Sequence, residues 1–214
     1  DKLAADRRIE QLSHTDALTG LPNRRLLADR AALALTVAAR DGTPFAVLFL
    51  DLDRFKVVND SVGHLVGDEL LKTAAARLVA SVQAPDVVAR LGGDEFAILL
   101  DDLQHPDRAT FVAERLISTL SEAMRIGGQE LFTSASVGIA FAHPRYLRAE
   151  ELLRDADVPM YRAKSQGRQR FELFDERLRA EALRVLDLEG DLRRALARGE
   201  FEPHFQAIVR LADS

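Results

Sequence analysis

The sequence contains no cysteine and no tryptophan, and aromatic residues make up only 6% of it. The lack of cysteine excludes disulfide bonds and thiolate metal sites. No apolar run approaches the roughly 20 residues of a membrane span. No secretory signal pattern opens the sequence, which starts Asp-Lys-Leu-Ala. We therefore expect a cytoplasmic segment, whose parent protein is compatible with a membrane anchor elsewhere.

Basic residues are outnumbered by acidic ones, 29 against 34, which gives a net charge of −5. This balance argues against sequence-independent binding of nucleic acid. It does not argue against a nucleotide, which needs only local positive charge. The length of 214 residues, 47% of them hydrophobic, suits one main core with additional helical material.

Changes of composition divide the chain into three expected segments. Residues 1–14 predict a linker or signalling helix, too short to be assigned as a coiled coil. Residues 15–174 form the main domain. Residues 175–214 predict a long charged helix over 176–198 and a strand over 201–211. A lone strand cannot bury its faces, so we expect this last segment to belong to a further domain.

Within the main domain, apolar runs alternate with helical periodicity. The run from Phe45 to Leu50 predicts a strand buried on both faces. Short apolar runs on either side of Gly92-Gly93 predict a hairpin. Further helices are predicted at 68–80, 107–124 and 149–165, and further strands at 131–141 and 171–174. The pattern predicts an α/β (α+β) fold, a mixed sheet flanked by helices with a central β-hairpin.

Local signals add three expectations about the helices. Asn23 is placed to cap a helix that Asp41-Gly42 ends. In that helix, Leu26, Leu33 and Val37 fall on one face, which we expect to be buried. Pro159 should bend the helix that contains it.

Acidic residues stand at the ends of two predicted strands. Asp51 and Asp53 follow the buried strand, and Asp94 and Glu95 occupy the tip of the hairpin. Carboxylates from neighbouring strands can share Mg²⁺, which accepts few carboxylates together with phosphate oxygens. The plainer alternatives are a helix cap with a solvated partner for the first pair, and an ordinary polar turn for the second.

Polar and basic residues near these strands suit a nucleotide. Asn59 and Asp68 together match the donor and acceptor edge of guanine, although His64 between them also fits a simple loop or cap position. Lys164 and Arg168 are four residues apart, so they share a helical face if the helix extends that far. A triphosphate would explain both charges, and a solvated helix end is the alternative.

These segments together resemble the GGDEF family of diguanylate cyclases, over roughly Thr15 to Phe174. Five motifs occur in the order typical of the family. They are Asp16-x-Leu-Thr-Gly-Leu-Pro-Asn-Arg-Arg25, Asp51-x-Asp53-x-Phe55-Lys56-x-x-Asn59-Asp60, Gly63-His64-x-x-Gly67-Asp68, Arg90-x-Gly-Gly-Asp94-Glu95-Phe96 and Tyr161-Arg-Ala-Lys164-x-x-Gly167-Arg168. The resemblance implies a fold like the palm of nucleotidyl cyclases. It also implies condensation of two GTP into cyclic di-GMP with release of pyrophosphate.

The resemblance implies a role for each matched residue at the reacting centre. Asp51 and Asp94 would ligate Mg²⁺ or Mn²⁺, assisted by the Leu52 carbonyl and by Glu95. Asp94 or Glu95 would help to deprotonate the attacking ribose 3′-hydroxyl. Lys56 would stabilise charge on the reacting phosphates.

The resemblance also implies how the substrate is held. Asn59 and Asp68 would contact guanine, and Lys164 and Arg168 would hold the triphosphate. The full substrate-binding set is Phe55, Asn59, His64, Asp68, Lys164 and Arg168. Because each such domain binds one GTP, turnover implies a homodimer, which an upstream sensor domain acting through the leader helix would control.

The inhibitory product-binding motif of the family, Arg-x-x-Asp, is degenerate in this sequence. The corresponding residues are Gln83 and Asp86, and glutamine lacks the charged fork that binds phosphate or guanine in two places. We expect product inhibition through this site to be weak or absent.

The C-terminal tail resembles the first helix and strand of an EAL phosphodiesterase domain, with Gln206 in that strand. The metal-binding motif of that family would follow Ser214. We therefore expect no phosphodiesterase activity from this chain. The leading hypothesis is an active cyclase. The alternative is a silent GTP-binding module that regulates an attached phosphodiesterase, and a purely structural dimerisation domain is a third reading.

Overall fold

The computed structural model describes residues 14–206 of the chain. The chain falls into two compact units, which join between Asp175 and Glu176. The predicted leader helix over residues 1–14 lies outside the described residues, apart from His14. No helix within the described stretch combines the length and the apolar character needed to cross a membrane.

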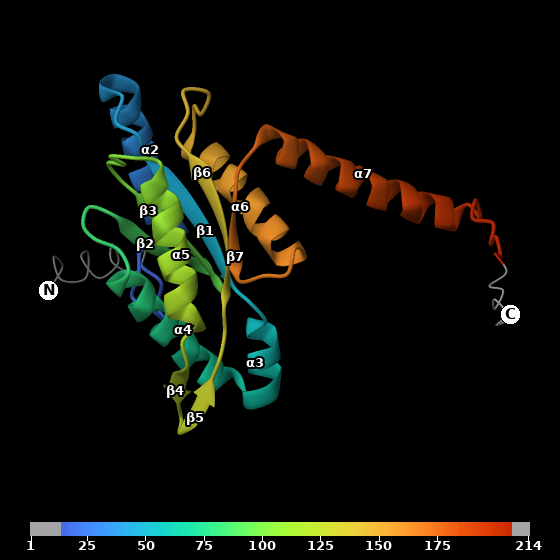
Figure 1. Cartoon of the computed structure of the whole chain (residues 1–214), viewed down its shortest axis with the longest axis horizontal. Helices are drawn as coiled ribbons and strands as arrows, with labels where there is room; N and C mark the ends of the chain where they lie inside the picture. The colour runs from blue at the N-terminus through green and yellow to red at the C-terminus, as the bar shows by residue number, and fades with distance from the viewer. Residues whose placement is uncertain (1–13, 207–214) are drawn as a thin grey trace, which may run out of the picture. The chain divides into compact units, whose positions relative to one another are not determined.

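A five-stranded mixed sheet organises the first unit, in the order β2-β3-β1-β6-β7 (Figure 1). β1 pairs antiparallel with both β3 and β6, and β7 runs parallel to β6. The five strands are β1 (Ala46–Leu52), β2 (Val87–Gly92), β3 (Glu95–Leu100), β6 (Ala135–Phe141) and β7 (Arg170–Leu173). A separate two-stranded sheet consists of β4 (Met124–Ile126) and β5 (Gln129–Leu131).

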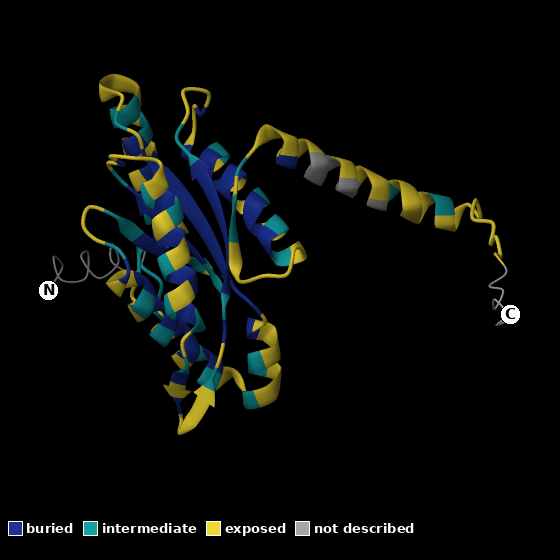
Figure 2. Ribbon diagram, viewed as in Figure 1, coloured by how far each residue is buried: buried dark blue, intermediate teal, exposed yellow. Residues whose placement is uncertain are grey.

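Helices cover both faces of the sheet. Residues of α4 (His64–Ala80) and α5 (Asp107–Ser121) pack on one face, and those of α2 (Arg24–Asp41) and α6 (Ala149–Ser165) pack on the other. Every residue of β1 is buried, as the apolar run predicted (Figure 2). Its side chains alternate between the two core clusters, with Leu48 and Leu50 in one and Val47 and Phe49 in the other. The predicted mixed sheet flanked by helices is confirmed.

The caps of α2 are those predicted, but its inward face is different. The Asn23 side chain accepts hydrogen bonds from two backbone N–H groups, and Gly42 ends the helix in the left-handed region at φ 71°. The buried positions are Leu27, Ala31 and Ala34. Leu33 is 58% exposed, so its predicted burial is wrong. The buried face uses two alanines, because α2 lies close to its neighbours.

The helix α6 extends from Ala149 to Ser165 as predicted, and Pro159 does not interrupt it. The helix lies against β6 at Gly138. A Cβ atom at Gly138 would lie 2.1 Å from the carbonyl oxygen of Ala156 and 2.4 Å from the backbone nitrogen of Met160. Glycine is therefore required here for close packing of helix on strand.

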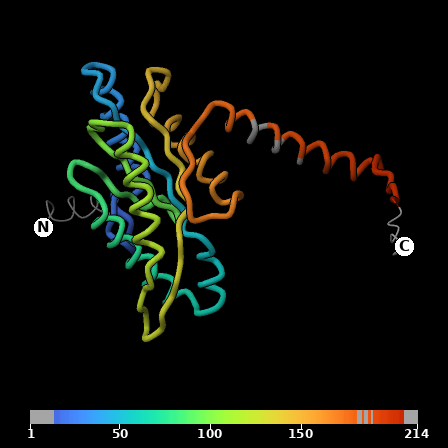
Figure 3. Tube along the Cα trace, in the orientation of Figure 1, coloured from blue at the N-terminus to red at the C-terminus, as the bar shows by residue number. Residues whose placement is uncertain are grey.

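Three predicted element boundaries are wrong. The helix predicted over 107–124 ends at Ser121, and β4 begins at Met124. The expected strand over 131–141 is two strands, β5 and β6, and the chain crosses between them through residues 132–134 (Figure 3). The second predicted helix begins at His64, and a short helix α3 (Phe55–Val62) precedes it.

The second unit contains the helix α7 (Glu176–Ala197), which agrees with the predicted charged helix. The expected strand over 201–211 is absent from residues 201–206, which have no regular structure. Its remaining residues lie outside the described part of the chain.

Candidate active site

The end of β1 and the β2–β3 hairpin bring the predicted acidic residues together. The Cα atom of Asp51 in β1 lies opposite that of Glu95 in β3. The backbone N–H of Leu52 donates to the carbonyl oxygen of Asp94 at 3.2 Å, which attaches the hairpin turn to the end of β1. Antiparallel pairing thus places carboxylates from two distant segments at one end of the central strands.

Asp51 is buried, with an exposed fraction of 5%, and it has a cationic partner. The Nζ atom of Lys164 lies 2.6 Å from its Oδ2 atom. Burial raises the pKa of Asp51 to about 6, the Lys164 hydrogen bond opposes that rise, and the charges of Asp94 and Glu95 add to it. The pair joins two residues to which the resemblance assigns different tasks, metal ligation and triphosphate binding.

Glu95 is in a similar electrostatic environment. Burial raises its pKa, the charges of Asp157 and Asp94 raise it further, and Arg24 and Lys164 oppose the rise. The Arg24 guanidinium lies 3.7 Å from a Glu95 carboxylate oxygen. Burial and the neighbouring carboxylates together therefore outweigh the nearby cations in setting the pKa of Glu95.

Sequence reasoning assigned no role to Arg24 or Asp157. Desolvation raises the pKa of Asp157, and Lys164 and Arg24 oppose that rise. Asp157 lies about two helical turns before Lys164 on α6, so both residues project from the same face of that helix. This spacing is the signal that could have identified Asp157. Arg24 stands in a quoted motif, but only the tertiary structure brings it to Glu95.

These carboxylates fit a divalent cation that arrives with a nucleotide. Within residues 14–206, no three or more His, Cys, Asp or Glu side chains are grouped to hold a metal by themselves. Mg²⁺ commonly takes one or two carboxylates and completes its shell with water and phosphate oxygens. The crowded carboxylates of Asp51, Asp94 and Glu95 are suitable oxygen donors, and burial together with neighbouring carboxylates raises the pKa values of Asp51 and Glu95.

The predicted guanine-reading residues lie on α3 and α4, which pack together. The Oδ1 atom of Asn59 is buried and has no hydrogen-bond partner. It faces Gly67, where a Cβ atom would lie only 1.7 Å away. Gly67 thus leaves the space that the Asn59 amide occupies. Buried polar groups are usually hydrogen-bonded, so this unpaired oxygen marks Asn59 as a candidate for ligand contact.

Other residues of this set have different environments. Asp68 is half-buried on the first turns of α4, and His64 is the exposed first residue of that helix. Lys56 is exposed on α3. Phe55 is 8% exposed and belongs to the core cluster beneath α4, so its ring packs against the protein.

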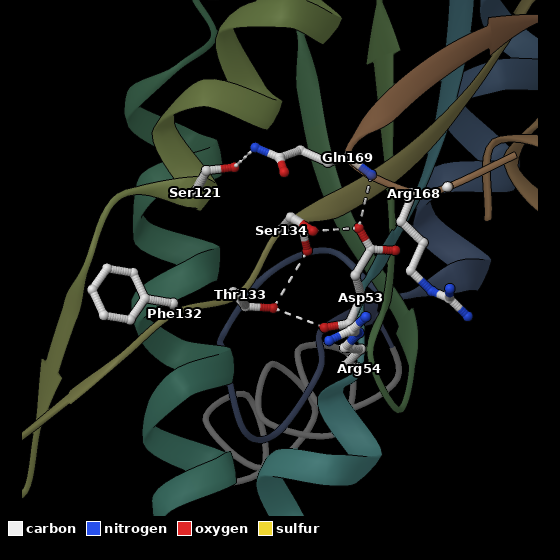
Figure 4. A pocket seen from close by; sticks show the side chains of 9 residues that line it. Asp53, Arg54, Ser121, Phe132, Thr133, Ser134, Arg168 and Gln169 are labelled. Atoms are coloured by element: carbon white, nitrogen blue, oxygen red, sulfur yellow. Dashed lines mark hydrogen bonds between the residues drawn. The ribbon is translucent and has the colours of Figure 1, made fainter.

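Lys164 and Arg168 do not share a helical face, because α6 ends at Ser165. Arg168 stands in the loop before β7 with a left-handed backbone at φ 66°. It lines a pocket of about 390 Å³, drawn in Figure 4. Arg54, Phe132 and Asp53 also line this pocket.

The hairpin turn is held from a second side by Arg90. Its guanidinium donates to the Gly93 carbonyl oxygen, from Nε at 3.0 Å and from Nη2 at 2.6 Å. Nη1 donates to Asp16 at 2.9 Å. Although burial favours its protonated form, hydrogen bonds from Thr19 and Arg90 hold the pKa of Asp16 below its usual value. The N-terminal turn and the acidic hairpin are thus rigidly connected.

The degenerate inhibitory motif is partly occupied by an internal ion pair. The Asp86 side chain is fully buried, and Nη2 of Arg108 lies 2.5 Å from its Oδ2 atom. Asp86 also accepts a hydrogen bond from the backbone N–H of Asp101. Gln83 is exposed.

Comparison with known proteins identifies the family. Residues 13–170 match the family described as "Diguanylate cyclase, GGDEF domain". The chain is 46% identical over 205 residues to the bifunctional diguanylate cyclase/cyclic di-GMP phosphodiesterase MucR of Pseudomonas aeruginosa, covering 96% of this chain and 30% of MucR. It is 41% identical over 157 residues to the diguanylate cyclase TpbB of the same species, covering 73% of this chain and 36% of TpbB.

Solved structures agree in fold. The GGDEF domain of TpbB (YfiN) superposes with a TM-score of 0.76 at 39% identity, covering 81% of this chain and 99% of that structure. DgcB of Caulobacter crescentus, solved in complex with c-di-GMP, gives a TM-score of 0.74 at 25% identity, covering 79% and 90%. The chain spans about a third or less of the length of the first curated relatives that it matches. It belongs to the GGDEF family, and its GGDEF domain is homologous to those of diguanylate cyclases.

Proposed function

We propose that this GGDEF domain condenses two GTP molecules into cyclic di-GMP, with release of pyrophosphate. The observation that carries the proposal is the convergence of Asp51, Glu95 and Lys164 at the end of β1, with Asp94 on the adjoining turn. Carboxylates beside a lysine ammonium group suit a metal-assisted phosphoryl transfer, in which a metal ion and cationic side chains stabilise charge on the phosphates. Homology to named cyclases supports the same conclusion.

The reaction joins the ribose 3′-oxygen of each GTP to the α-phosphorus of the other, in two steps that each release one pyrophosphate. The 3′-hydroxyl loses its proton, the new P–O bond forms, and the α–β bridging P–O bond breaks as pyrophosphate leaves. We assign the proton acceptor to the Asp94–Glu95 pair and favour Glu95, because a carboxylate with a raised pKa is better suited to accept a proton. A bound Mg²⁺ or Mn²⁺ ion, held by Asp51 and Asp94 with Glu95 and the Leu52 carbonyl, supplies electrostatic stabilisation of the phosphates.

The substrate-binding roles are proposed from the same positions. Asn59 and Asp68 contact the guanine edge, with His64 nearby. Lys56 faces the reacting phosphates, and Lys164 and Arg168 hold the triphosphate. In this structure the Nζ atom of Lys164 lies 2.6 Å from a carboxylate oxygen of Asp51. We expect Lys164 to move from Asp51 to the phosphates when GTP binds, and Asp51 would then be available to hold a divalent cation.

The product contains two guanosine units, and one domain supplies one set of guanine-binding residues. Turnover therefore requires two copies of the domain facing each other, a homodimer at least during the reaction. We propose that an upstream sensor domain controls this pairing through residues 1–14, and that residues 175–214 are a linker helix and the start of an EAL domain.

A regulatory role is the second candidate. Relatives at similar identity include the cyclic di-GMP phosphodiesterase NbdA of Pseudomonas aeruginosa, 37% identical over 205 residues. In such a protein the GGDEF domain would bind GTP without forming product and would control the attached phosphodiesterase.

Chromatographic detection of cyclic di-GMP, after incubation with GTP and Mg²⁺ at high protein concentration, tests the proposal. Wild type should form product, whereas Asp94→Asn and Glu95→Gln should lose at least about 100-fold in rate. GTP binding without product would favour the regulatory role. Product from all three proteins would contradict the assignment of the acidic residues.

A further inference from the structure

Asp53 is a buried carboxylate for which the proposed chemistry has no use. It is 4% exposed, and none of the described residues forms an ion pair with it. Its charge is instead held by hydrogen bonds, from Ser134 Oγ to Oδ2 at 2.5 Å and from Ser136 Oγ to Oδ1 at 2.7 Å. Oδ2 also accepts from the backbone N–H of Gln169 at 3.2 Å, as Figure 4 shows.

The last of these bonds reaches a loop with an unfavourable backbone. Gly167, Arg168 and Gln169 have consecutive positive φ angles of 114°, 66° and 50°. Two of these residues are not glycine, and a left-handed conformation in such residues persists only where surrounding contacts hold it. Contacts that hold the loop include the bond from the Arg168 N–H to the Ala163 carbonyl at 3.0 Å and the bond from the Gln169 N–H to Asp53. The Gln169 side chain also donates from Nε2 to Ser121 Oγ at 3.2 Å.

This backbone determines where the Arg168 side chain points. Arg168 and Arg54 both line the pocket to which Asp53 contributes. Figure 4 shows the Arg168 side chain on one side of Asp53 and Phe132 on the other, with Arg54 below Asp53. A charged carboxylate makes stronger hydrogen bonds than a neutral acceptor, so Asp53 is well suited to fix the loop. Its oxygens are occupied by protein donors.

We propose that Asp53 is a positioning residue, whose carboxylate fixes the loop of residues 166–169 so that Arg168 meets the triphosphate. The inference rests on the proposed function, because it takes GTP as the ligand. Asp53 acts through Arg168 and not on the metal, which distinguishes it from Asp51, two residues earlier in the same motif. A purely structural role would weaken all ligands alike through the stability of the domain.

Binding measurements separate these cases without any need for turnover. The ligands are 3′-deoxy-GTP, which lacks the attacking hydroxyl, and GMP, which lacks the β- and γ-phosphates, each titrated calorimetrically with Mg²⁺. Asp53→Ala should weaken 3′-deoxy-GTP binding about tenfold, the scale of one charged hydrogen bond, and leave GMP binding unchanged. Asp53→Asn should recover most of the affinity, since its amide oxygen can still accept from Gln169.

A double-mutant cycle then tests whether Asp53 acts on nucleotide binding through Arg168. Arg168→Ala should also weaken 3′-deoxy-GTP binding, and adding Asp53→Ala should cause no further loss. The matched control is Asp155→Ala, which removes a carboxylate that is 1% exposed and bonded to Tyr146 in another part of the domain. It should leave the ratio of the two affinities unchanged.

The outcomes distinguish this inference from the proposed function. Equal losses for both ligands in Asp53→Ala, or losses that add to those of Arg168→Ala, would overturn the positioning role alone. A wild-type chain that binds neither nucleotide would overturn both proposals.

Discussion

At the scale of single residues, the site is defined by charges that are incompletely neutralised. Asp51 and Glu95 have raised pKa values because burial and neighbouring carboxylates act together. Lys164 and Arg24 offset part of this rise in pKa. Carboxylates whose charged form is disfavoured in the protein gain favourable interactions when a metal–nucleotide complex binds beside them.

The first prediction concerns Asp51→Asn in metal-free buffer. The folded pKa of about 6 lies above the ordinary value of 3.8, so the folded state binds this proton more tightly than the unfolded state does. The carboxyl is therefore tolerated at pH 4 and becomes unfavourable as pH rises through 6. Relative to wild type, the variant should gain about 2 kcal/mol in free energy of unfolding between pH 4 and pH 8.

Urea denaturation at both pH values in the presence of a chelator measures this gain. Asp41→Asn is the control, because that exposed carboxylate has a pKa lowered by Arg40 and should show no such increase. An equal difference between Asp51→Asn and wild type at both pH values would contradict the prediction.

The second prediction concerns Gly67→Ala. The added Cβ would lie 1.7 Å from the Asn59 side-chain oxygen, so the amide must move away from its position. GTP and GMP should both bind about tenfold more weakly, because the change affects guanine contacts and not the phosphates. Calorimetry measures both affinities. In a chain that already carries Asn59→Ala, Gly67→Ala should not weaken GTP or GMP binding further. A further loss of affinity in that background would show that Gly67 does not act through Asn59.

At the scale of elements, the sequence predicted correctly those features that depend on neighbouring residues in the chain. The apolar run of β1 and the Asn23 cap of α2 are confirmed. The break before β6 was missed because Thr133 and Ser134 form hydrogen bonds with Asp53, about 80 residues away in sequence. The end of α6 at Ser165 was predicted. The position of Arg168 after it was not, since the left-handed loop contacts that distant carboxylate.

The same distinction applies to the candidate site. The proximity of Asp51 to Glu95 follows from two strands that were predicted to be neighbours. The Lys164–Asp51 pair and the effects of Arg24 and Asp157 require helix packing against the sheet, which no periodicity in the sequence specifies.

The third prediction concerns the contact between α6 and β6. Gly138→Ala would place a Cβ atom 2.1 Å from a backbone oxygen of α6, and a backbone atom cannot turn aside as a side chain can. The free energy of unfolding should fall by about 2–4 kcal/mol, measured by urea denaturation. Gly190→Ala is the control, since its Cβ would meet only the flexible end of Arg194 at 3.3 Å. A loss below about 1 kcal/mol would show that the helix shifts easily.

The fourth prediction concerns the turn before β2. Because Gln83 has no charge and Asp86 is paired with Arg108, cyclic di-GMP should inhibit the wild type weakly or not at all. Gln83→Arg should lower the inhibitory product concentration at least about fivefold, since a guanidinium binds phosphate or guanine through two donors. Initial rates at increasing product concentration measure the effect. Gln83→Lys adds the charge without the planar guanidinium, so it should lower the inhibitory product concentration less than Gln83→Arg does. Equal inhibition of all three proteins would exclude this site.

At the scale of the whole molecule, the first unit contains the complete hydrophobic core expected of an independent domain. Both core clusters draw their buried residues from positions before Asp175. The family match ends at residue 170. The second unit begins at Glu176 and contains α7, whose described residues are mostly exposed.

The fifth prediction is that a chain ending at Asp175 folds like the whole. Since no residue of either core cluster is removed, the thermal midpoint should change by less than about 3 °C, and the affinity for 3′-deoxy-GTP should be unchanged. Calorimetric unfolding and titration of the two chains provide the comparison. Truncation at Phe141 is the matched control, because it removes α6 and β7 and should abolish cooperative unfolding. A marked fall in midpoint for the chain ending at Asp175 would show that residues after 175 complete the domain, and its boundary would then lie within α7.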